Sequence, residues 1–319
     1  MIRVRFIVFA FVLPCALLDH AAAATPTPMV VYQARVASMS GDSAGARKVL
    51  KQYRDALGVT PEYIEGLSWV ARGELGANQY AAAEATAGEV RTLVLAKLTG
   101  RKLDAEPSLP MALGASIEVQ AQAAKATGRR DQAVGFLRAE AEKWRGTSIV
   151  ARIRKNLNLL TLEGKSAPAL ETSKVVAGPP AKPLEQHRGH PVLLFFWAHW
   201  CSDCKNQLAV IRQLQAKYGP KGLEVIAPTQ HYGYVAGGED APLDVETRYI
   251  QAVYQQFYAS LGKVETPLSE KNFESYGVSS TPTLALVDGR GVVRMYNPGN
   301  VSYEVLAAKV EAALKVGGR

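Results

Sequence analysis

A continuous apolar run, Val192–Trp197, is separated by three residues from a closely spaced pair of cysteines, Cys201 and Cys204. Six apolar residues in a row are typical of a β-strand that is buried on both faces. After the cysteines, residues Leu208 to Tyr218 place apolar side chains at helical spacing. A buried strand that leads through a short turn into a helix beginning with two cysteines predicts an α/β architecture for this part of the chain.

The rest of the C-terminal half continues this alternation. We predict a second buried strand at Leu223–Pro228 and an amphipathic helix at Asp244–Leu261. The apolar stretches Thr283–Asp288 and Val292–Tyr296 flank a glycine turn and predict a hairpin. A final helix is expected from about Ser302 to Lys315. Together these elements predict a domain with a central mixed sheet.

Between these predicted elements, residues 229–243 are rich in glycine and irregular, and they make a long connection after a strand. Within it, the segment Gln230–Asp240 is either a partner-recognition loop or an insertion without a role of its own, and both interpretations stay open.

The N-terminal half has a different composition. Residues 43–162 are rich in Ala, Leu, Gln, Glu, Lys and Arg, and their apolar residues recur at helical spacing. Gly41, Gly76 and Gly128 each precede a helix with small and large apolar residues, which resembles half of a tetratricopeptide motif. We predict an all-α domain at 25–162, built either of stacked helical hairpins or as a generic bundle. Glycine and proline between residues 163 and 191 indicate a boundary, so the second domain is predicted at 163–319.

Residues 1–24 have the pattern of a secretory signal peptide, with a basic start, an apolar run from Phe6 to Leu18 and small residues at Ala21–Ala24. The apolar run is shorter than the roughly 20 residues that span a bilayer. Pro14 before Cys15 fits a lipoprotein motif poorly. We therefore expect a cleaved signal, no later membrane span, and a periplasmic or secreted protein. A lipoprotein and a retained anchor are the alternatives.

The formal net charge of +8 is spread along the chain without a run of five to eight Lys or Arg. Such a distribution argues against nucleic-acid binding. Removal of residues 1–24 also removes Cys15, which leaves Cys201 and Cys204 as the cysteines of the mature chain.

The predicted helix begins at Cys201-Ser202-Asp203-Cys204, and this position favours thiol–disulfide chemistry. A thiolate attacks disulfides, and the partial positive charge of a helix N-terminus lowers the thiol pKa. Cysteines three residues apart lie one helical turn from each other, close enough to bridge. We expect Cys201 to be exposed at the helix tip and to attack, and Cys204 to be shielded and to resolve the mixed disulfide.

Two other interpretations of this cysteine pair stay open. A stabilising bridge across so short a loop would contribute only about 2 kcal/mol. A zinc site would need further ligands, for which the mature chain predicted above offers four histidines: His187, His190, His199 and His231. We favour the redox pair and predict neither a metal nor another cofactor.

The second signal is Ser280-Thr281-Pro282-Thr283, which opens an apolar strand. Proline at the head of a strand must have its missing donor accommodated. A cis Thr281–Pro282 bond would turn the backbone toward the cysteines, and an extended substrate could then pair with the amide and carbonyl of Thr281.

These two motifs, W-A-x-W-C-x-x-C-K and V-S-S-T-P-T-L-A-L-V-D-G-x-G-V-V, resemble the thioredoxin superfamily, and the exported TlpA/ResA-like disulfide reductases most closely. The resemblance covers residues 166–319 and implies a thioredoxin-like fold. It implies that Cys201 is the nucleophile and Cys204 the resolving thiol, joined as a redox-active disulfide. It also implies that Trp200 shapes the surface around the dithiol, and that Thr281 and Pro282 form a substrate shelf.

The chain departs from this family at two acidic positions, where Phe195 replaces a buried Asp and Gln207 replaces a Glu. The resemblance therefore leaves the proton of the resolving thiol without an assigned partner. Asp203 is a substitute candidate, although a solvated helix residue is the plainer interpretation. His199 could tune Cys201 if it points toward the sulfur, but we expect an exposed and unengaged imidazole.

These observations predict an extracytoplasmic thiol–disulfide oxidoreductase that acts on protein substrates, with a bias toward reduction. It would need an upstream thiol protein as electron donor, and its helical domain would make protein contacts. The resembled family suggests apocytochrome c as a candidate client, but nothing in this sequence selects it. A thiol peroxidase and a non-enzymatic scaffold that binds protein or metal are the alternatives.

Overall fold

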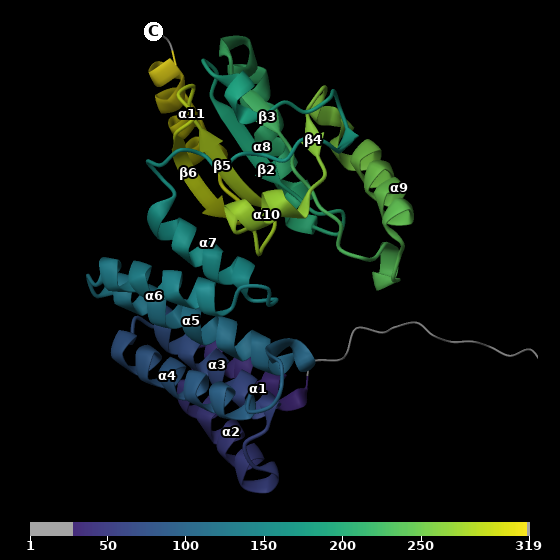
Figure 1. Ribbon diagram of the computed structural model, residues 1–319. Coiled ribbons are helices and arrows are strands. Elements are labelled where there is room, and N and C mark those ends of the chain that lie inside the picture. Colours follow the sequence, from purple (N-terminus) through teal and green to yellow (C-terminus); the bar gives the residue numbers. More distant parts are fainter. Residues whose placement is uncertain (1–27, 318–319) are drawn as a thin grey trace, which may run out of the picture.

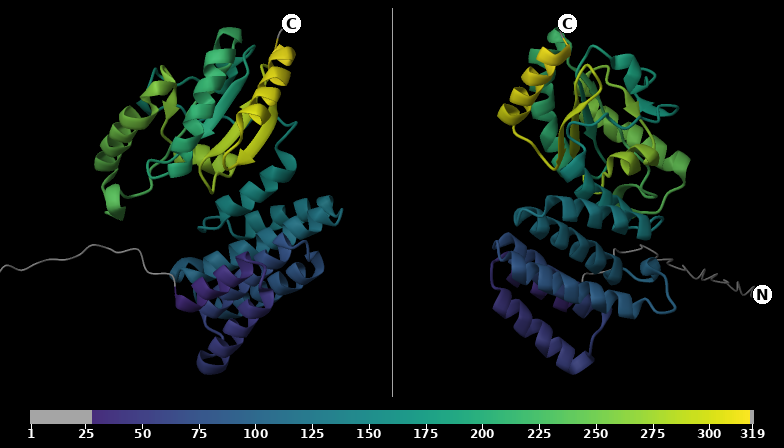
Figure 2. Two further views of the ribbon diagram at one scale, coloured as in Figure 1. Left: turned by 180° about the vertical axis from the view of Figure 1, so that it is seen from behind. Right: turned by 60° about the vertical axis from the view of Figure 1, so that its left-hand side comes forward.

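The computed structural model of the protein describes residues 28–317, which form a helical part and an α/β part (Figure 1). The predicted signal peptide lies outside the described residues. Within them, no helix is long and apolar enough to cross a bilayer. Helix α7 lies between the two parts, and the views of Figure 2 agree on this arrangement.

The N-terminal part is all-helical from residue 29 to residue 161, as predicted, apart from turns. Its helices are α1 (Met29–Met39), α2 (Ser43–Leu57), α3 (Pro61–Gly76), α4 (Tyr80–Lys97), α5 (Ser108–Ala126), α6 (Arg130–Lys143) and α7 (Val150–Thr161), with a 3-10 turn at Leu103–Ala105. Helix α3 begins where the sequence indicates, because Pro61 occupies its first turn and the Thr60 hydroxyl accepts a hydrogen bond from the Tyr63 amide.

Three helix ends in this part share one turn geometry. A residue with positive φ, namely Gly41, Asn78 or Gly128, follows the helix. In each case the next amide donates to the carbonyl five residues earlier, as in Gln79 to Glu74. The expectation that Gly76 is the turn residue is wrong, because Gly76 still belongs to α3 and Asn78 takes the left-handed conformation. Asparagine can do so because its short polar side chain tolerates this region.

With this correction the three turns align, since a buried alanine follows each turn residue by five positions: Ala46, Ala83 and Ala133. Small side chains there allow neighbouring helices to approach closely. The buried residues of α1, α3, α5 and α6 join in one continuous core. A helical stack is the result, while its assignment as tetratricopeptide repeats stays a prediction.

The C-terminal part has a four-stranded mixed sheet in the order β3-β2-β5-β6, plus a two-stranded pair of β1 and β4. The strands are β1 (Val175–Ala177), β2 (Val192–Phe196), β3 (Glu224–Ile226), β4 (Thr266–Pro267), β5 (Thr283–Val287) and β6 (Val293–Pro298). The helices are α8 (Ser202–Tyr218), α9 (Leu243–Val253), α10 (Glu270–Tyr276) and α11 (Tyr303–Gly317). This is the α/β thioredoxin-like arrangement that the sequence predicts.

Strand β2 is central, parallel to β3 and antiparallel to β5. Its side chains alternate between two cores, as a strand buried on both faces requires. Leu193 and Phe195 pack with buried residues of α8 and α11. Leu194 and Phe196 face the opposite core, where the Phe196 ring contacts that of Phe273 edge-on at 5.4 Å between centroids.

Three elements of this part were not predicted. Strands β1 and β4 are two or three residues long and α10 has seven residues, so each is shorter than the window over which apolar periodicity identifies a strand or a helix. The predicted helix at Asp244–Leu261 is also interrupted: α9 ends at Val253, and a π-helical turn, Tyr254–Tyr258, and a 3-10 turn, Ala259–Leu261, follow.

Helix α7 joins the two parts through contacts with α10. The Arg154 guanidinium lies 2.5 Å from the Glu274 carboxylate, and the Asn158 amide donates to the Tyr276 carbonyl at 2.8 Å. At Gly277 the two backbones approach so closely that a Cβ atom would lie 2.7 Å from the Lys155 nitrogen. The helical part is therefore seated directly on the α/β part.

Candidate active site

Cys201 and Cys204 are joined by a disulfide at the start of α8, with their Cα atoms 5.3 Å apart. Cys201 is the N-cap residue, and its sulfur accepts a hydrogen bond from the Cys204 amide at 3.0 Å. The sulfur thus occupies the position of an anion at a helix N-terminus, where free amides and the helix dipole stabilise negative charge.

The burial of the pair differs from expectation. Cys201 is 2% exposed and Cys204 is fully buried, so the prediction that Cys201 is exposed at the helix tip is wrong. The reason is that the turn before α8 is embedded in the apolar core that both cysteines join. Trp200, immediately before Cys201, is by contrast 49% exposed, and its ring contacts Tyr232 edge-on at 5.5 Å.

The turn that presents the disulfide is anchored at Trp197. The Trp197 indole donates to the Ala227 carbonyl at 3.0 Å, and the Trp197 carbonyl accepts from the Thr229 hydroxyl at 2.9 Å. Its ring packs against Tyr258 at 4.2 Å between centroids. Because the neighbouring strand fixes both the backbone and the ring of Trp197, the residues between β2 and α8 have a defined path.

Thr281 and Pro282 lie at the same edge of the sheet as the start of α8. In the register of β2 and β5, Thr283 is paired with Phe196, so Pro282 is level with the residue that follows β2. The Thr281–Pro282 peptide bond is cis. Among residues 28–317 the backbone amide and carbonyl of Thr281 make no backbone hydrogen bond, and its hydroxyl is buried without a partner. An extended chain could pair with Thr281 there.

His199 is also placed differently from expectation, because its side chain is buried and engaged. The imidazole Nε2 lies 3.4 Å from a carboxylate oxygen of Glu246. Three tyrosine rings contact the imidazole edge-on at 5.2–5.5 Å between centroids: Tyr232, Tyr234 and Tyr249. The exposed imidazole that we expected is therefore wrong.

Glu246 is the residue of this site that the sequence did not reveal. It is fully buried, and its two carboxylate oxygens accept the backbone amides of Tyr232 and Gly233 at 2.5 and 2.9 Å. These bonds tie the glycine-rich connection after β3 to helix α9. The signal that could have identified it is an acidic residue within the first turn of a predicted amphipathic helix.

The surroundings also set the protonation of His199. Burial lowers the pKa of the imidazole below its usual value, and the nearby Glu246 carboxylate offsets only part of this effect. The ring is therefore neutral near pH 7. A neutral imidazole beside a carboxylate still gives the site a buried polar contact within an otherwise aromatic cluster.

The positions that replace the acidic residues of the resembled family are neutral and buried. The Phe195 ring lies in the core near Tyr258. The Gln207 amide donates to the Val301 carbonyl and accepts the Val301 amide, at 3.0 and 2.9 Å, which joins α8 to the start of α11. Asp203 is exposed in the first turn of α8, in line with the plainer of its two interpretations.

The remaining histidines lie in separate environments. His187 contacts Glu224, and the His231 ring nitrogen lies 2.8 Å from the Thr247 hydroxyl. The part of the chain that the structure describes contains no group of three or more His, Cys, Asp or Glu arranged to hold a metal ion.

Comparison with known proteins agrees with this geometry. A family model described as a thioredoxin-like domain matches residues 184–314. Over 150 residues the chain is 26% identical to the thioredoxin-like protein YneN of Bacillus subtilis, covering 47% of this chain and 79% of that protein. It is also 26% identical over 129 residues to the thiol-disulfide oxidoreductase ResA of Geobacillus thermodenitrificans, covering 40% of this chain and 66% of ResA.

Among solved structures, a Chlorobium tepidum protein assigned as thiol:disulfide interchange protein DsbE is 27% identical, with a TM-score of 0.37. That match covers 48% of this chain and 97% of the other. Each similarity therefore concerns about half of the present chain or less.

Proposed function

We propose, from the premise that residues 184–314 form a thioredoxin-like domain, that this domain exchanges thiols and disulfides with protein clients through Cys201 and Cys204. The observation that carries the proposal is the bridged cysteine pair at the N-terminus of α8. The helix terminus stabilises a thiolate on Cys201, and the partner sulfur is already within bonding distance.

In the reduced protein the Cys201 thiolate attacks one sulfur of a client disulfide. A mixed disulfide forms, and the other client sulfur leaves as a thiolate. The Cys204 thiolate then attacks Cys201, which closes the bridge and releases the second client thiolate. Two electrons pass to the client, so a separate thiol protein must reduce the bridge before the next turnover.

The unpaired backbone of Thr281 supports the proposal that the client binds beside this residue. A client segment in extended form can donate to and accept from Thr281 as an added strand, with its disulfide toward Cys201. Because Cys201 is 2% exposed, exchange also requires a neighbouring side chain to move aside. The exposed Trp200 next to it would contact the bound client.

We propose that the protein acts as a reductant. The exposed Asp203 carboxylate in the first turn of α8 offsets part of the stabilisation that the helix terminus gives to a thiolate at Cys201, and so favours the disulfide form. The measured reduction potential of the pair tests this direction. A value near that of strong oxidants, about −120 mV, would refute it.

An extracytoplasmic location belongs to the same proposal, since the pattern of residues 1–24 supports export. Cell fractionation tests it. Recovery of the unprocessed chain in the cytoplasm would contradict it.

Insulin reduction with dithiothreitol as the electron source tests the activity. We expect the wild type to accelerate the reaction and both Cys201→Ser and Cys204→Ser to abolish the acceleration. Cys204→Ser should also accumulate mixed disulfides with clients, whereas Cys201→Ser should not, because only Cys201 attacks the client. Equal behaviour of the wild type and both variants would favour the scaffold interpretation.

A further inference from the structure

A groove runs between the helical part and the loop that precedes β5. One section of about 900 Å³ is lined by α3, α5 and α7 and reaches Ser279 and Ser280. A second section of about 490 Å³ continues along α5 and α7. The two sections share three lining residues, Leu75, Asn78 and Gln122, so they form one continuous groove.

The groove ends beside Thr281, the residue with which an extended client is proposed to pair. Ser279 and Ser280 are both exposed, and Ser280 directly precedes Thr281, whose backbone is unpaired. Successive residues of an extended chain advance by about 3.3 Å. A client paired with Thr281 therefore enters the groove within a few residues.

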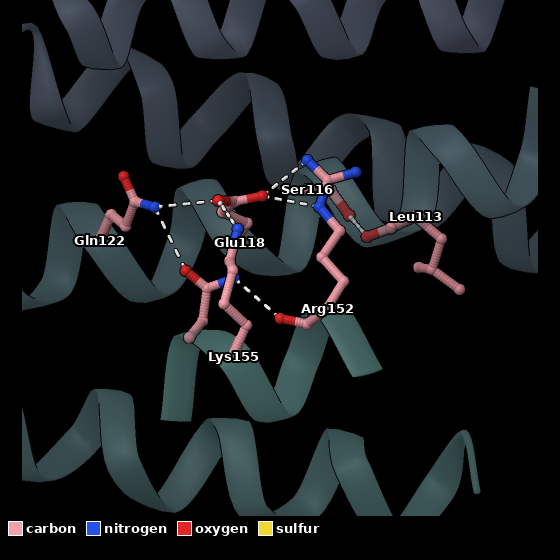
Figure 3. Close-up of polar contacts among 7 residues, drawn as sticks. Leu113, Ser116, Glu118, Gln122, Arg152 and Lys155 are labelled. Carbon is pink, nitrogen blue, oxygen red and sulfur yellow. Dashed lines mark hydrogen bonds and ion pairs between the residues drawn. The ribbon is translucent and has the colours of Figure 1, made fainter. Parts of the chain in front are cut away.

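The charge of the groove is predominantly positive. Its lining includes Arg72, Arg152, Lys155 and Lys125, against the single carboxylate of Glu118. Figure 3 shows how this carboxylate is shared: Arg152 lies 2.6 Å away, Lys155 2.9 Å, and the Gln122 amide 3.2 Å. Burial opposes ionisation of Glu118, yet the two cations hold its pKa at about 2. Glu118 is thus fully ionised, but it neutralises only one of the positive charges.

Arg72 is the cation with no carboxylate of its own. Its guanidinium lies over the Trp69 ring at 4.2 Å, and within residues 28–317 it makes no ion pair or side-chain hydrogen bond. Burial, together with repulsion from Arg152, lowers its pKa to about 10. Glu118 and Glu65 attract the Arg72 guanidinium from nearby, but neither forms an ion pair with it, so an incoming carboxylate could pair directly with this partly buried cation. Lys125 is exposed at the other section and takes part in no described ion pair.

We propose that this basic groove binds an acidic segment of the protein client, adjacent to the client disulfide that is presented at Thr281. The inference rests on the proposed function and assigns it a class of substrate. Carboxylates of the client would pair with Arg72 and Lys125, and apolar side chains between them would contact Leu75. The helical part would thus select clients, while the thioredoxin-like part performs the exchange.

Peptides with one intramolecular disulfide test this inference. Two matched peptides carry a flank of either four Asp or four Lys, and the flank is placed in turn on each side of the cysteines. With dithiothreitol as electron source, we expect the wild type to reduce the Asp-flanked peptide with a kcat/KM about tenfold higher at low salt. The preference should shrink at high salt, because mobile ions screen exposed charges.

Single variants connect the preference to the groove. Arg72→Gln and Lys125→Gln should each lower the ratio of the two kcat/KM values by about threefold. Lys125→Gln keeps the test valid if Arg72→Gln folds poorly, because Lys125 is exposed. Arg138→Gln is the matched control: Arg138 is exposed on α6 and does not line the groove, so its loss should leave the ratio unchanged.

The outcomes separate the two proposals. Reduction of both peptides at the same rate, or an equal loss of preference in Arg138→Gln, would refute the role of the groove and leave the proposed function standing. Failure of the wild type to reduce either peptide would refute the proposed function, and the role of the groove with it.

Discussion

Replacement of Glu246 by Gln should show how much one buried carboxylate contributes to the stability of the site. Glu246 is fully buried, and each of its oxygens accepts a backbone amide, from Tyr232 at 2.5 Å and from Gly233 at 2.9 Å. Hydrogen bonds to an ionised group contribute about 1.5–3 kcal/mol each. Glutamine keeps one acceptor but presents an NH₂ group to the other amide, so one bond is lost and a donor is left buried. We expect Glu246→Gln to lower the free energy of unfolding by about 2–4 kcal/mol.

Two measurements check this expectation. Urea unfolding gives the change in free energy, and hydrogen–deuterium exchange of residues 229–243 reports the loss of the tether locally. Asp244→Asn is the matched control on the same helix. The Asp244 side chain is 69% exposed and paired with Arg248, so its change should cost less than about 1 kcal/mol. Equal stability and equal exchange in the two variants would refute the reasoning.

Two further changes test the burial of His199 and the junction of the two parts. Because burial lowers the folded pKa of His199 below 6.5, its contribution to stability is present above that pH and is lost as the pH falls, when the unfolded chain binds the proton more tightly. His199→Asn should therefore reduce the loss of unfolding free energy between about pH 7.5 and about pH 5.5, and a loss equal to that of the wild type would contradict this. Gly277→Ala should lower the free energy of unfolding, measured in urea, clearly more than Gly237→Ala. Gly277 (φ 62°, ψ 38°) and Gly237 (φ 72°, ψ −1°) both have left-handed backbone, which costs a substituted residue about 1–2 kcal/mol, but only at Gly277 would the new Cβ meet backbone, 2.7 Å from the Lys155 nitrogen. Equal losses of unfolding free energy in the two variants would contradict close backbone packing between α7 and Gly277.

Most of the α/β part was predictable because its signals are local. The run Val192–Trp197 is continuous and apolar, and it forms the central strand β2. The predicted hairpin is present as β5 and β6, and the Asp288 carboxylate at its turn accepts the amides of Arg290 and Val292. Such patterns depend on residues a few positions apart, so they can be recognised without knowing how distant segments pack.

Sequence by itself determined the position of the cysteine pair: a buried strand, a short turn and a helix that begins at Cys201 follow from neighbouring residues alone. Tertiary structure decided what surrounds that pair. His199 is buried because α9, which begins more than forty residues later, folds back and supplies Glu246. The groove likewise exists because α7 holds the helical part against the α/β part. Burial and charge pairing between distant segments depend on how those segments pack, and no local pattern encodes that packing.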